Sequence, residues 1–146
     1  MIIDTKYHGQ INISQKDIWT FRQGLPGFAG EKQFTLLAFP DNGVFFVLQS
    51  TNTPSLGFIV ANPFSFFPDY DIQLEDSAVA ALQLEKAEQA AVYTILTVHD
   101  PFEQTTANLQ APVIVNTASN QAKQVILNDR RYQTRHPLFP AGAAKE

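Results

Sequence analysis

Short apolar runs of strand length recur along almost the whole chain, separated by polar or turn-forming residues. The clearest run occupies residues 113–115, at the end of the stretch TANLQAPVIVN that covers 106–116. Before it, Asn108 can close a turn through its own side chain, and Pro112 fixes φ and removes a backbone donor. The β-branched run that follows is typical of a strand buried on both faces.

Two further apolar runs, at 92–98 and 124–127, flank this strand across short polar connectors. Runs joined in this way predict three consecutive antiparallel strands. The N-terminal half repeats the pattern, and the Asn-Gly pair in 40–43 is the strongest short hairpin signal. We therefore also expect two short strands within 2–13 and single strands at 18–21, 34–39, 44–49 and 56–61.

The sequence GLPGF at 24–28 interrupts this pattern sharply. Each glycine can adopt a positive φ, and Pro26 presets a turn. We interpret the segment as a required turn with Phe28 packed into the core, with a contact loop as the less favoured alternative.

Helical signals are confined to two short segments. Residues 77–82 read SAVAAL, with Asp76 or Ser77 placed to cap them, and 85–91 indicate a further helical turn. Alanine-rich pieces this short are marginal alone and must dock on the sheet. The prediction is a mainly β, single-domain, antiparallel β-barrel-like fold over 1–139 with one or two short helices, followed by a disordered tail at 140–146.

Composition excludes several classes of protein. The chain of 146 residues has no cysteine, so disulfides, thiol catalysis and thiolate metal sites are unavailable. Its first residues lack the pattern of a signal peptide, and its apolar windows are too short to span a bilayer. We expect a cytoplasmic protein with no membrane contact. The net charge of −4 also disfavours direct nucleic-acid binding.

Charge is distributed unevenly along the chain. Between Asp69 and Glu103 there are eight acids and a single base, Lys86. Between Lys123 and Arg135 the balance reverses, with four bases and one acid. The middle of the chain therefore offers an acidic face to a basic partner, although such spans are more often simply solvated.

Catalytic and metal-binding patterns are missing from the sequence. His8, His99 and His136 are far apart, and no pair of ligands has helix or hairpin spacing. No glycine-rich phosphate loop, nucleophile elbow or HExxH motif occurs. Asp69 and Asp71 would share one face of a strand, but solvated acids explain them better than acid–base chemistry. We predict no enzymatic activity, no cofactor and no metal.

The segment 64–70 is the strongest candidate contact site. Four aromatic side chains lie close to Pro63 and Pro68, which exclude a helix interior and argue against a central strand. The segment forms either a lid over an open barrel end or an apolar contact patch rimmed by acids. In an extended backbone Phe64 and Phe66 point one way and Phe67 the other, so we expect Phe67 to anchor the lid. The candidate partner-binding residues are Phe64, Phe66, Asp69, Tyr70, Asp71, Glu75 and Asp76.

Several of these patterns occur together in a recognisable order: GLPGF at 24–28, LQS at 48–50, NP at 62–63, NLQAPVIVN at 108–116 and QVIL at 124–127. This ordered set resembles the FliW family of flagellar assembly factors over residues 2–136. The resemblance implies a β-barrel-like, non-enzymatic cytoplasmic protein that binds flagellin and CsrA, the carbon storage regulator. CsrA is a small dimeric RNA-binding protein that represses flagellin translation, and a freed FliW-like protein lifts that repression. The rival hypothesis is a small-molecule-binding β-barrel whose aromatic side chains line a cavity.

Overall fold

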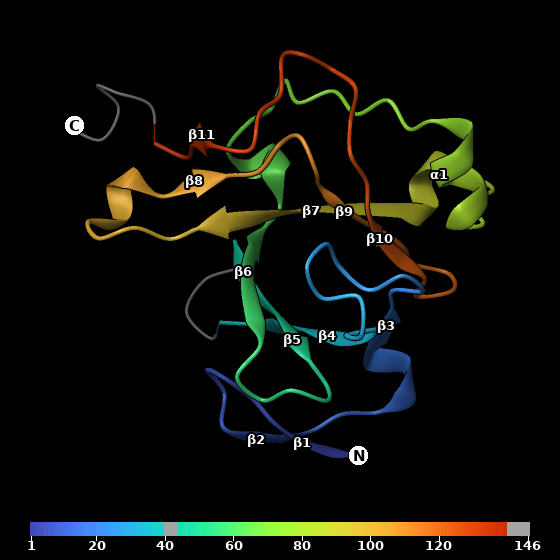
Figure 1. The fold of residues 1–146 in the computed structure, drawn as a ribbon, viewed down its shortest axis with the longest axis vertical. Coiled ribbons are helices and arrows are strands. Elements are labelled where there is room, and N and C mark those ends of the chain that lie inside the picture. Colours follow the sequence, from blue (N-terminus) through green and yellow to red (C-terminus); the bar gives the residue numbers. More distant parts are fainter. Residues whose placement is uncertain (40–43, 140–146) are drawn as a thin grey trace.

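The computed structural model describes residues 1–39 and 44–139 as a succession of short strands with few helical turns (Figure 1). The predicted hairpin at 40–43 and the predicted tail at 140–146 lie outside the described residues. The strands are β1 Ile2–Asp4, β2 Gln10–Asn12, β3 Ile18–Thr20, β4 Gln33–Ala38, β5 Phe45–Ser50, β6 Gly57–Ala61, β7 Ala90–Thr97, β8 Thr106–Ala107, β9 Val113–Asn116, β10 Ala122–Gln124 and β11 His136–Pro137. The helix is α1 Asp76–Ala81, and the 3-10 turns are η1 Gln15–Asp17, η2 Pro63–Ser65, η3 Ala87–Gln89 and η4 Phe102–Gln104.

The sheet follows the order of the chain closely. Its strands lie in the order β10-β9-β7-β6-β5-β4-β3, and each neighbouring pair is antiparallel. β8 pairs with β7 and with β11, while β1 and β2 form a separate hairpin. The prediction of a mainly β, antiparallel fold is confirmed, and so is the adjacency of the three apolar runs around 113–115.

The strand predicted at 124–127 ends earlier than expected, because β10 stops at Gln124. The chain still runs beside its neighbour, since the Val125 N–H donates to the Pro112 carbonyl at 2.9 Å and the Leu127 N–H to the Gln110 carbonyl at 2.7 Å. Pro112 has no N–H with which to return a bond, so the regular ladder is lost there.

The large sheet is rolled so that its two ends approach each other, and we call this meeting point the seam. At the seam the Thr20 N–H donates to the Asn120 carbonyl at 2.9 Å, and a single parallel bridge joins Thr20 to Gln121. The Asn120 side-chain amide adds a bond of 2.8 Å to the Lys16 carbonyl. A barrel-like description is therefore loose, because one bridge replaces a continuous ladder between the ends.

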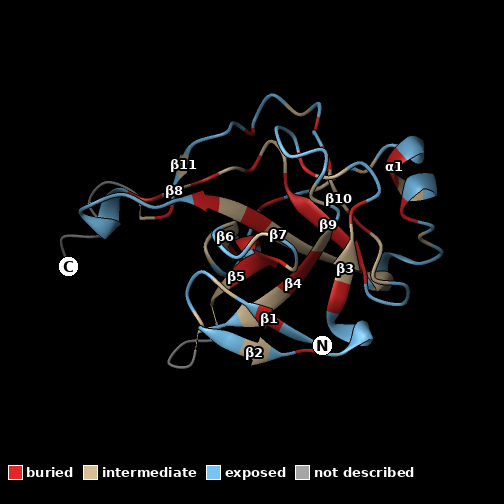
Figure 2. Ribbon diagram, turned by 60° about the horizontal axis from the view of Figure 1, so that its bottom comes forward, coloured by how far each residue is buried: buried red, intermediate tan, exposed pale blue. Residues whose placement is uncertain are grey.

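One cluster of buried residues fills the interior of the roll. Phe21, Phe34 and Val113 are fully buried there. Figure 2 shows β9, which contains Val113, coloured as buried. The aromatic rings contact one another, with centroids 5.3 Å apart for Phe21 and Phe34 and 6.3 Å apart for Phe34 and Phe58. This packing of ring against ring fills the interior of the roll. An aromatic-lined hollow of about 490 Å³ lies instead at the surface, where Tyr7 and Phe102 are exposed.

A second cluster covers the other side of β7 and β9. Helix α1 docks there through Ala78 and Leu82, which are 5% and 1% exposed. The helix predicted at 77–82 is confirmed, with each end shifted by one residue. It also packs against the sheet, as expected for so short a helix. The predicted turn at 85–91 is confirmed in part, because η3 occupies only Ala87–Gln89 before β7 begins.

The turn at 24–28 has the expected backbone but a different core residue. Gly24 and Gly27 adopt φ of 66° and 83°. Leu25 is 3% exposed, whereas Phe28 is 39% exposed and rests edge-on against Phe58 at 5.6 Å. The prediction that Phe28 is packed into the core is wrong, because Leu25 takes that position.

Candidate protein-binding surface

A short helical turn, not extended backbone, begins the aromatic segment. Asn62 caps η2, and its side-chain oxygen accepts a hydrogen bond of 2.9 Å from the Phe64 N–H. Pro63 occupies the start of the turn, where its fixed φ fits and its missing N–H costs nothing. The Phe67 N–H then donates a hydrogen bond of 2.8 Å to the Pro63 carbonyl.

This turn gives Phe64 and Phe66 different surroundings. Phe64 is 43% exposed, and its ring lies 5.9 Å from that of Tyr70. Phe66 is half-buried, stacked on Phe45 at 5.7 Å and edge-on to Phe139 at 6.2 Å. The expectation of a shared direction is wrong, because the backbone is helical between them. Phe64 is therefore the aromatic side chain of this segment that faces solvent most.

Phe67 and Tyr70 belong to the covering layer. Phe67 is half-buried and packs edge-on against His136 at 6.1 Å. Tyr70 is 6% exposed, and its hydroxyl donates to the Leu109 carbonyl at 2.6 Å. Burial beside Tyr132 raises the pKa of Tyr70 well above its ordinary value. Tyr70 thus lies beneath the surface, and its placement in an exposed patch is corrected.

Phe64 stands at the rim of an apolar hollow of about 510 Å³, which we call the Phe64 groove. Side chains from the segment after Tyr70, from α1 and from β7 form its walls. The lining residues are Phe64, Ile72, Leu74, Val79, Leu84, Glu85, Lys86, Ala87, Ala90, Val92 and Ile114. Ile72, Leu74 and Leu84 are half-buried, so the groove offers apolar surface that is only partly covered.

The predicted acidic residues do not gather in one place. Asp69 borders a separate hollow of about 390 Å³ beside Phe66 and Tyr132. Asp71 lies 3.7 Å from the guanidinium of Arg131, and its N–H donates to the Tyr132 hydroxyl at 2.8 Å.

The other two acids lie at the start of α1. Asp76 is exposed in the first turn of the helix. Glu75, the residue before it, accepts a hydrogen bond from the Asn128 side chain. The structure therefore does not bring the seven predicted residues together: Phe64 lines one hollow, Phe66, Asp69 and Tyr70 line a second, and Asp71, Glu75 and Asp76 line neither.

Arg131 explains part of this distribution, and sequence reasoning missed it. It forms a bond of 2.6 Å with Asp129 and also approaches Asp71, so the basic C-terminal segment lies against the acidic one. Hydrogen bonds from Arg131 lower the pKa of Asp129. The same hydrogen bonds, together with the negative charge of Asp129, raise the pKa of Arg131. Nothing in the local pattern signals the approach of Arg131 to Asp71, because these two residues are remote in sequence.

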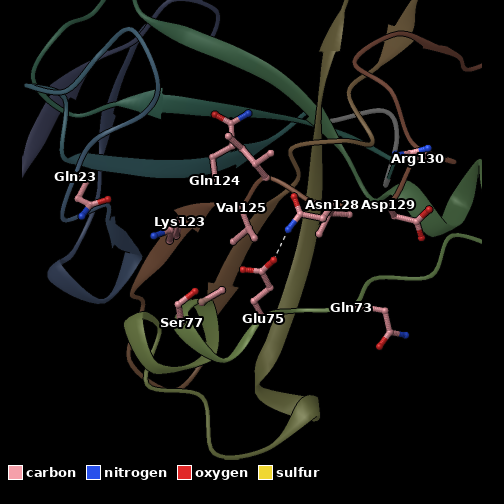
Figure 3. A pocket seen from close by; sticks show the side chains of 13 residues that line it. Gln23, Gln73, Glu75, Ser77, Lys123, Gln124, Val125, Asn128, Asp129 and Arg130 are labelled. Atoms are coloured by element: carbon pink, nitrogen blue, oxygen red, sulfur yellow. Dashed lines mark hydrogen bonds between the residues drawn. The ribbon is translucent and has the colours of Figure 1, made fainter.

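A larger polar hollow of about 880 Å³ lies between the start of α1 and the segment after β10, and we call it the edge groove (Figure 3). Its lining is rich in side-chain amides, and Glu75 reaches across it toward Asn128. The lining residues are Gln23, Gln73, Glu75, Ser77, Ala78, Lys123, Gln124, Val125, Ile126, Leu127, Asn128, Asp129 and Arg130.

The described residues contain neither a group of potential metal ligands nor a membrane-spanning helix. Across 1–39 and 44–139, no three His, Cys, Asp or Glu side chains are grouped as metal ligands would be. In the same residues, no helix combines the length and apolar character needed to cross a bilayer.

The fold and hollows are those of a small, mainly antiparallel β protein with open, surface-facing grooves. The FliW protein family profile matches residues 2–138, almost all of this chain. The chain therefore belongs to the FliW family of flagellar assembly factors.

Individual relatives agree with this assignment. A flagellar assembly factor FliW from Geobacillus kaustophilus is 53% identical over 145 residues, covering 99% of this chain and 100% of the relative. Its counterpart from Bacillus subtilis is 47% identical over 138 residues, covering 94% and 96% of the two chains. A crystal structure of the flagellar assembly factor FliW superposes with a TM-score of 0.93 at 51% identity, covering 97% of this chain and 99% of that one.

Proposed function

We propose that this chain is a non-enzymatic, cytoplasmic regulator of flagellar assembly that acts by binding two proteins. It binds CsrA and thereby relieves the repression of flagellin translation. Flagellin competes for the same pool of regulator, so accumulated flagellin frees CsrA to repress again. Family membership supports the flagellar role, and the CsrA and flagellin partners are the expectation drawn from the family resemblance.

The observation that carries a binding role is the Phe64 groove. A phenylalanine that is 43% exposed beside a partly open apolar hollow presents a large side chain without a covering layer of its own. Interface cores are enriched in aromatic residues, and the surrounding rim is polar. In the Phe64 groove, Glu85 and Lys86 form part of a polar rim, and Ile72 and Leu74 form part of the apolar lining.

The charge around this groove favours a basic partner. Glu85 and Glu88 are both exposed on the segment that borders it. Asp71, in contrast, already has Arg131 within 3.7 Å and contributes less free negative charge. A partner with a basic surface would be steered toward the groove by the unpaired acids.

Phe64→Ala tests the groove directly. Because Phe64 is half-exposed, its truncation should leave the melting temperature of the chain close to that of the wild type. Binding to CsrA should weaken by about 2 kcal/mol or more, roughly 30-fold in Kd, as at an interface hot spot. Size-exclusion chromatography shows whether a complex forms, and isothermal titration calorimetry gives the affinity.

Phe28→Ala is the matched control, because Phe28 is 39% exposed but belongs to the turn at 24–28. It should bind like the wild type. Equal losses for the two variants, or a Phe64→Ala variant that melts much earlier, would remove the Phe64 groove from the proposal. Wild-type protein that forms no complex with CsrA or flagellin would remove the proposed function itself.

Association with CsrA should also depend on salt. Raising ionic strength from low to physiological values screens exposed charges, so the association rate should fall more than the dissociation rate rises. A variant carrying both Glu85→Gln and Glu88→Gln should flatten this dependence, whereas Asp71→Asn should change it less. Stopped-flow association rates that ignore salt in the wild type would exclude electrostatic steering.

A further inference from the structure

The outer edge of β10 and its continuation is free over the residues that line the edge groove. In an antiparallel ladder, residues that bond the neighbouring strand alternate with residues whose N–H and C=O point the other way. Val125 and Leu127 donate inward to the carbonyls of Pro112 and Gln110. The main-chain groups of Gln124 and Ile126 therefore point outward, away from β9.

The seam uses this outer edge only at its beginning. The Asn120 carbonyl accepts from the Thr20 N–H, but the next residue, Phe21, already donates to the Lys32 carbonyl at 2.8 Å. Within residues 1–39 and 44–139, no hydrogen bond to the outward main-chain groups of Gln124 or Ile126 is found. An unpaired edge of this kind is a ready template for another strand.

The edge groove lies directly along this free edge. Gln73, Glu75 and Ser77 form the wall that faces it, and Gln23 lies toward one end (Figure 3). Beside the edge, Ile126 is 66% exposed and adds an apolar contact. The hollow thus combines free backbone groups, side-chain amides and one exposed aliphatic side chain.

Basic side chains outnumber acidic ones among the charges of the edge groove that have no ion pair, in contrast to the chain as a whole. The acidic one is Glu75, which accepts a hydrogen bond from the neutral Asn128 side chain, whereas Asp129 forms an ion pair with Arg131. Lys123 and Arg130, among the described residues, have no ion pair. They flank the free edge, and the seven residue steps between them span at most about 25 Å in extended chain.

We propose that the edge groove binds an extended segment of a partner protein, which adds a strand along Gln124–Asn128. Its apolar side chain lies against Ile126, and acidic side chains at its two ends meet Lys123 and Arg130. Strand addition of this kind takes affinity from main-chain hydrogen bonds and specificity from alternate side chains. The inference goes beyond the proposed function, because this surface prefers the opposite charge to the Phe64 groove.

The test uses two synthetic peptides of alternating valine and threonine, one with glutamate at both ends and the other with lysine. The glutamate-ended peptide should bind the full chain about tenfold more tightly than the lysine-ended one, a difference of about 1.4 kcal/mol. In ¹⁵N-correlated spectra, the amide signals of Gln124, Ile126 and Asn128 should shift and become protected from exchange. The double variant Lys123→Glu with Arg130→Glu should reverse the preference.

Ile126→Pro tests the backbone contact, because it deletes an outward donor and leaves the inward bonds of Val125 and Leu127 in place. It should abolish peptide binding, whereas Ile126→Thr, which keeps the N–H, should lose far less. Phe64→Ala should bind the peptide like the wild type, which separates this inference from the proposed function. If Ile126→Pro fails to fold, the charge reversal decides alone.

Three results would overturn the inference: equal binding of both peptides, amide shifts elsewhere than at 124–128, or a folded Ile126→Pro variant with undiminished binding. A wild-type dimer in light scattering that Ile126→Pro dissociates would also overturn it, since a second copy would then occupy the edge.

Discussion

Replacing Gly24 by alanine should destabilise the chain by more than about 3 kcal/mol, whereas Gly27→Ala should cost about 1 kcal/mol, at the low end for a strained φ. Both residues have positive φ, at 66° and 83°. A Cβ at Gly24 would lie 2.4 Å from the Phe28 carbonyl oxygen and 2.7 Å from that of Ala29, whereas one at Gly27 would meet no atom within 4 Å. Backbone atoms cannot move aside as a flexible side chain does, so the turn itself must open at Gly24.

Chemical denaturation of the wild type and the two alanine variants measures this difference. The Gly24→Ala variant should unfold at a much lower denaturant concentration or fail to accumulate as folded protein. Similar midpoints for the two variants would show that the turn relaxes easily and that its close approach is unimportant.

Gln49→Leu should cost about 3 kcal/mol, since each buried polar group left unpaired costs about 1–3 kcal/mol. Gln49 is fully buried, and its side-chain oxygen accepts from the Lys6 N–H at 3.0 Å. Its amide nitrogen donates to the carbonyls of Ser50, Pro54 and Leu56 at 3.0 to 3.2 Å. One side chain thus ties the N-terminal hairpin to the loop before β6, and leucine makes none of these bonds.

Calorimetry together with hydrogen exchange tests this role. The Lys6 amide should exchange faster in Gln49→Leu than in the wild type, and the melting temperature should fall. Gln23→Leu, at an exposed amide, is the control and should stay within about 0.5 kcal/mol of the wild type. An unchanged exchange rate at Lys6 would mean that the hairpin is held by other contacts.

Strands with an apolar pattern of their own could be read from the sequence, and those without one could not. The β-branched runs of β9 and of its neighbour β7 predict both strands from the sequence. The two-residue strands β8 and β11 are too short for any periodicity. They form because β8 pairs with the end of β7 and β11 pairs with β8. Local pattern carries no information about such remote pairing.

The candidate site shows the same division. The Asn62-Pro63 pair is a recognisable helix start, and it could have predicted the turn that separates Phe64 from Phe66. The burial of Tyr70 could not be predicted, because it depends on the Leu109 carbonyl and the ring of Tyr132, both remote in sequence. Exposure of a single aromatic residue is a property of the assembled fold.

The seam also has a kinetic consequence. From β3 to β6 each strand pairs with the next strand along the chain across a short connection, so this part of the sheet can form at a low entropic cost of loop closure. The seam joins segments that are 104 residues apart at Asn120 and Lys16 and has few bonds to hold it. It should form late in folding and open first in the native state. Each such opening would lengthen the free edge from Gln124 back to Asn120, and with it the length of strand that a partner could add.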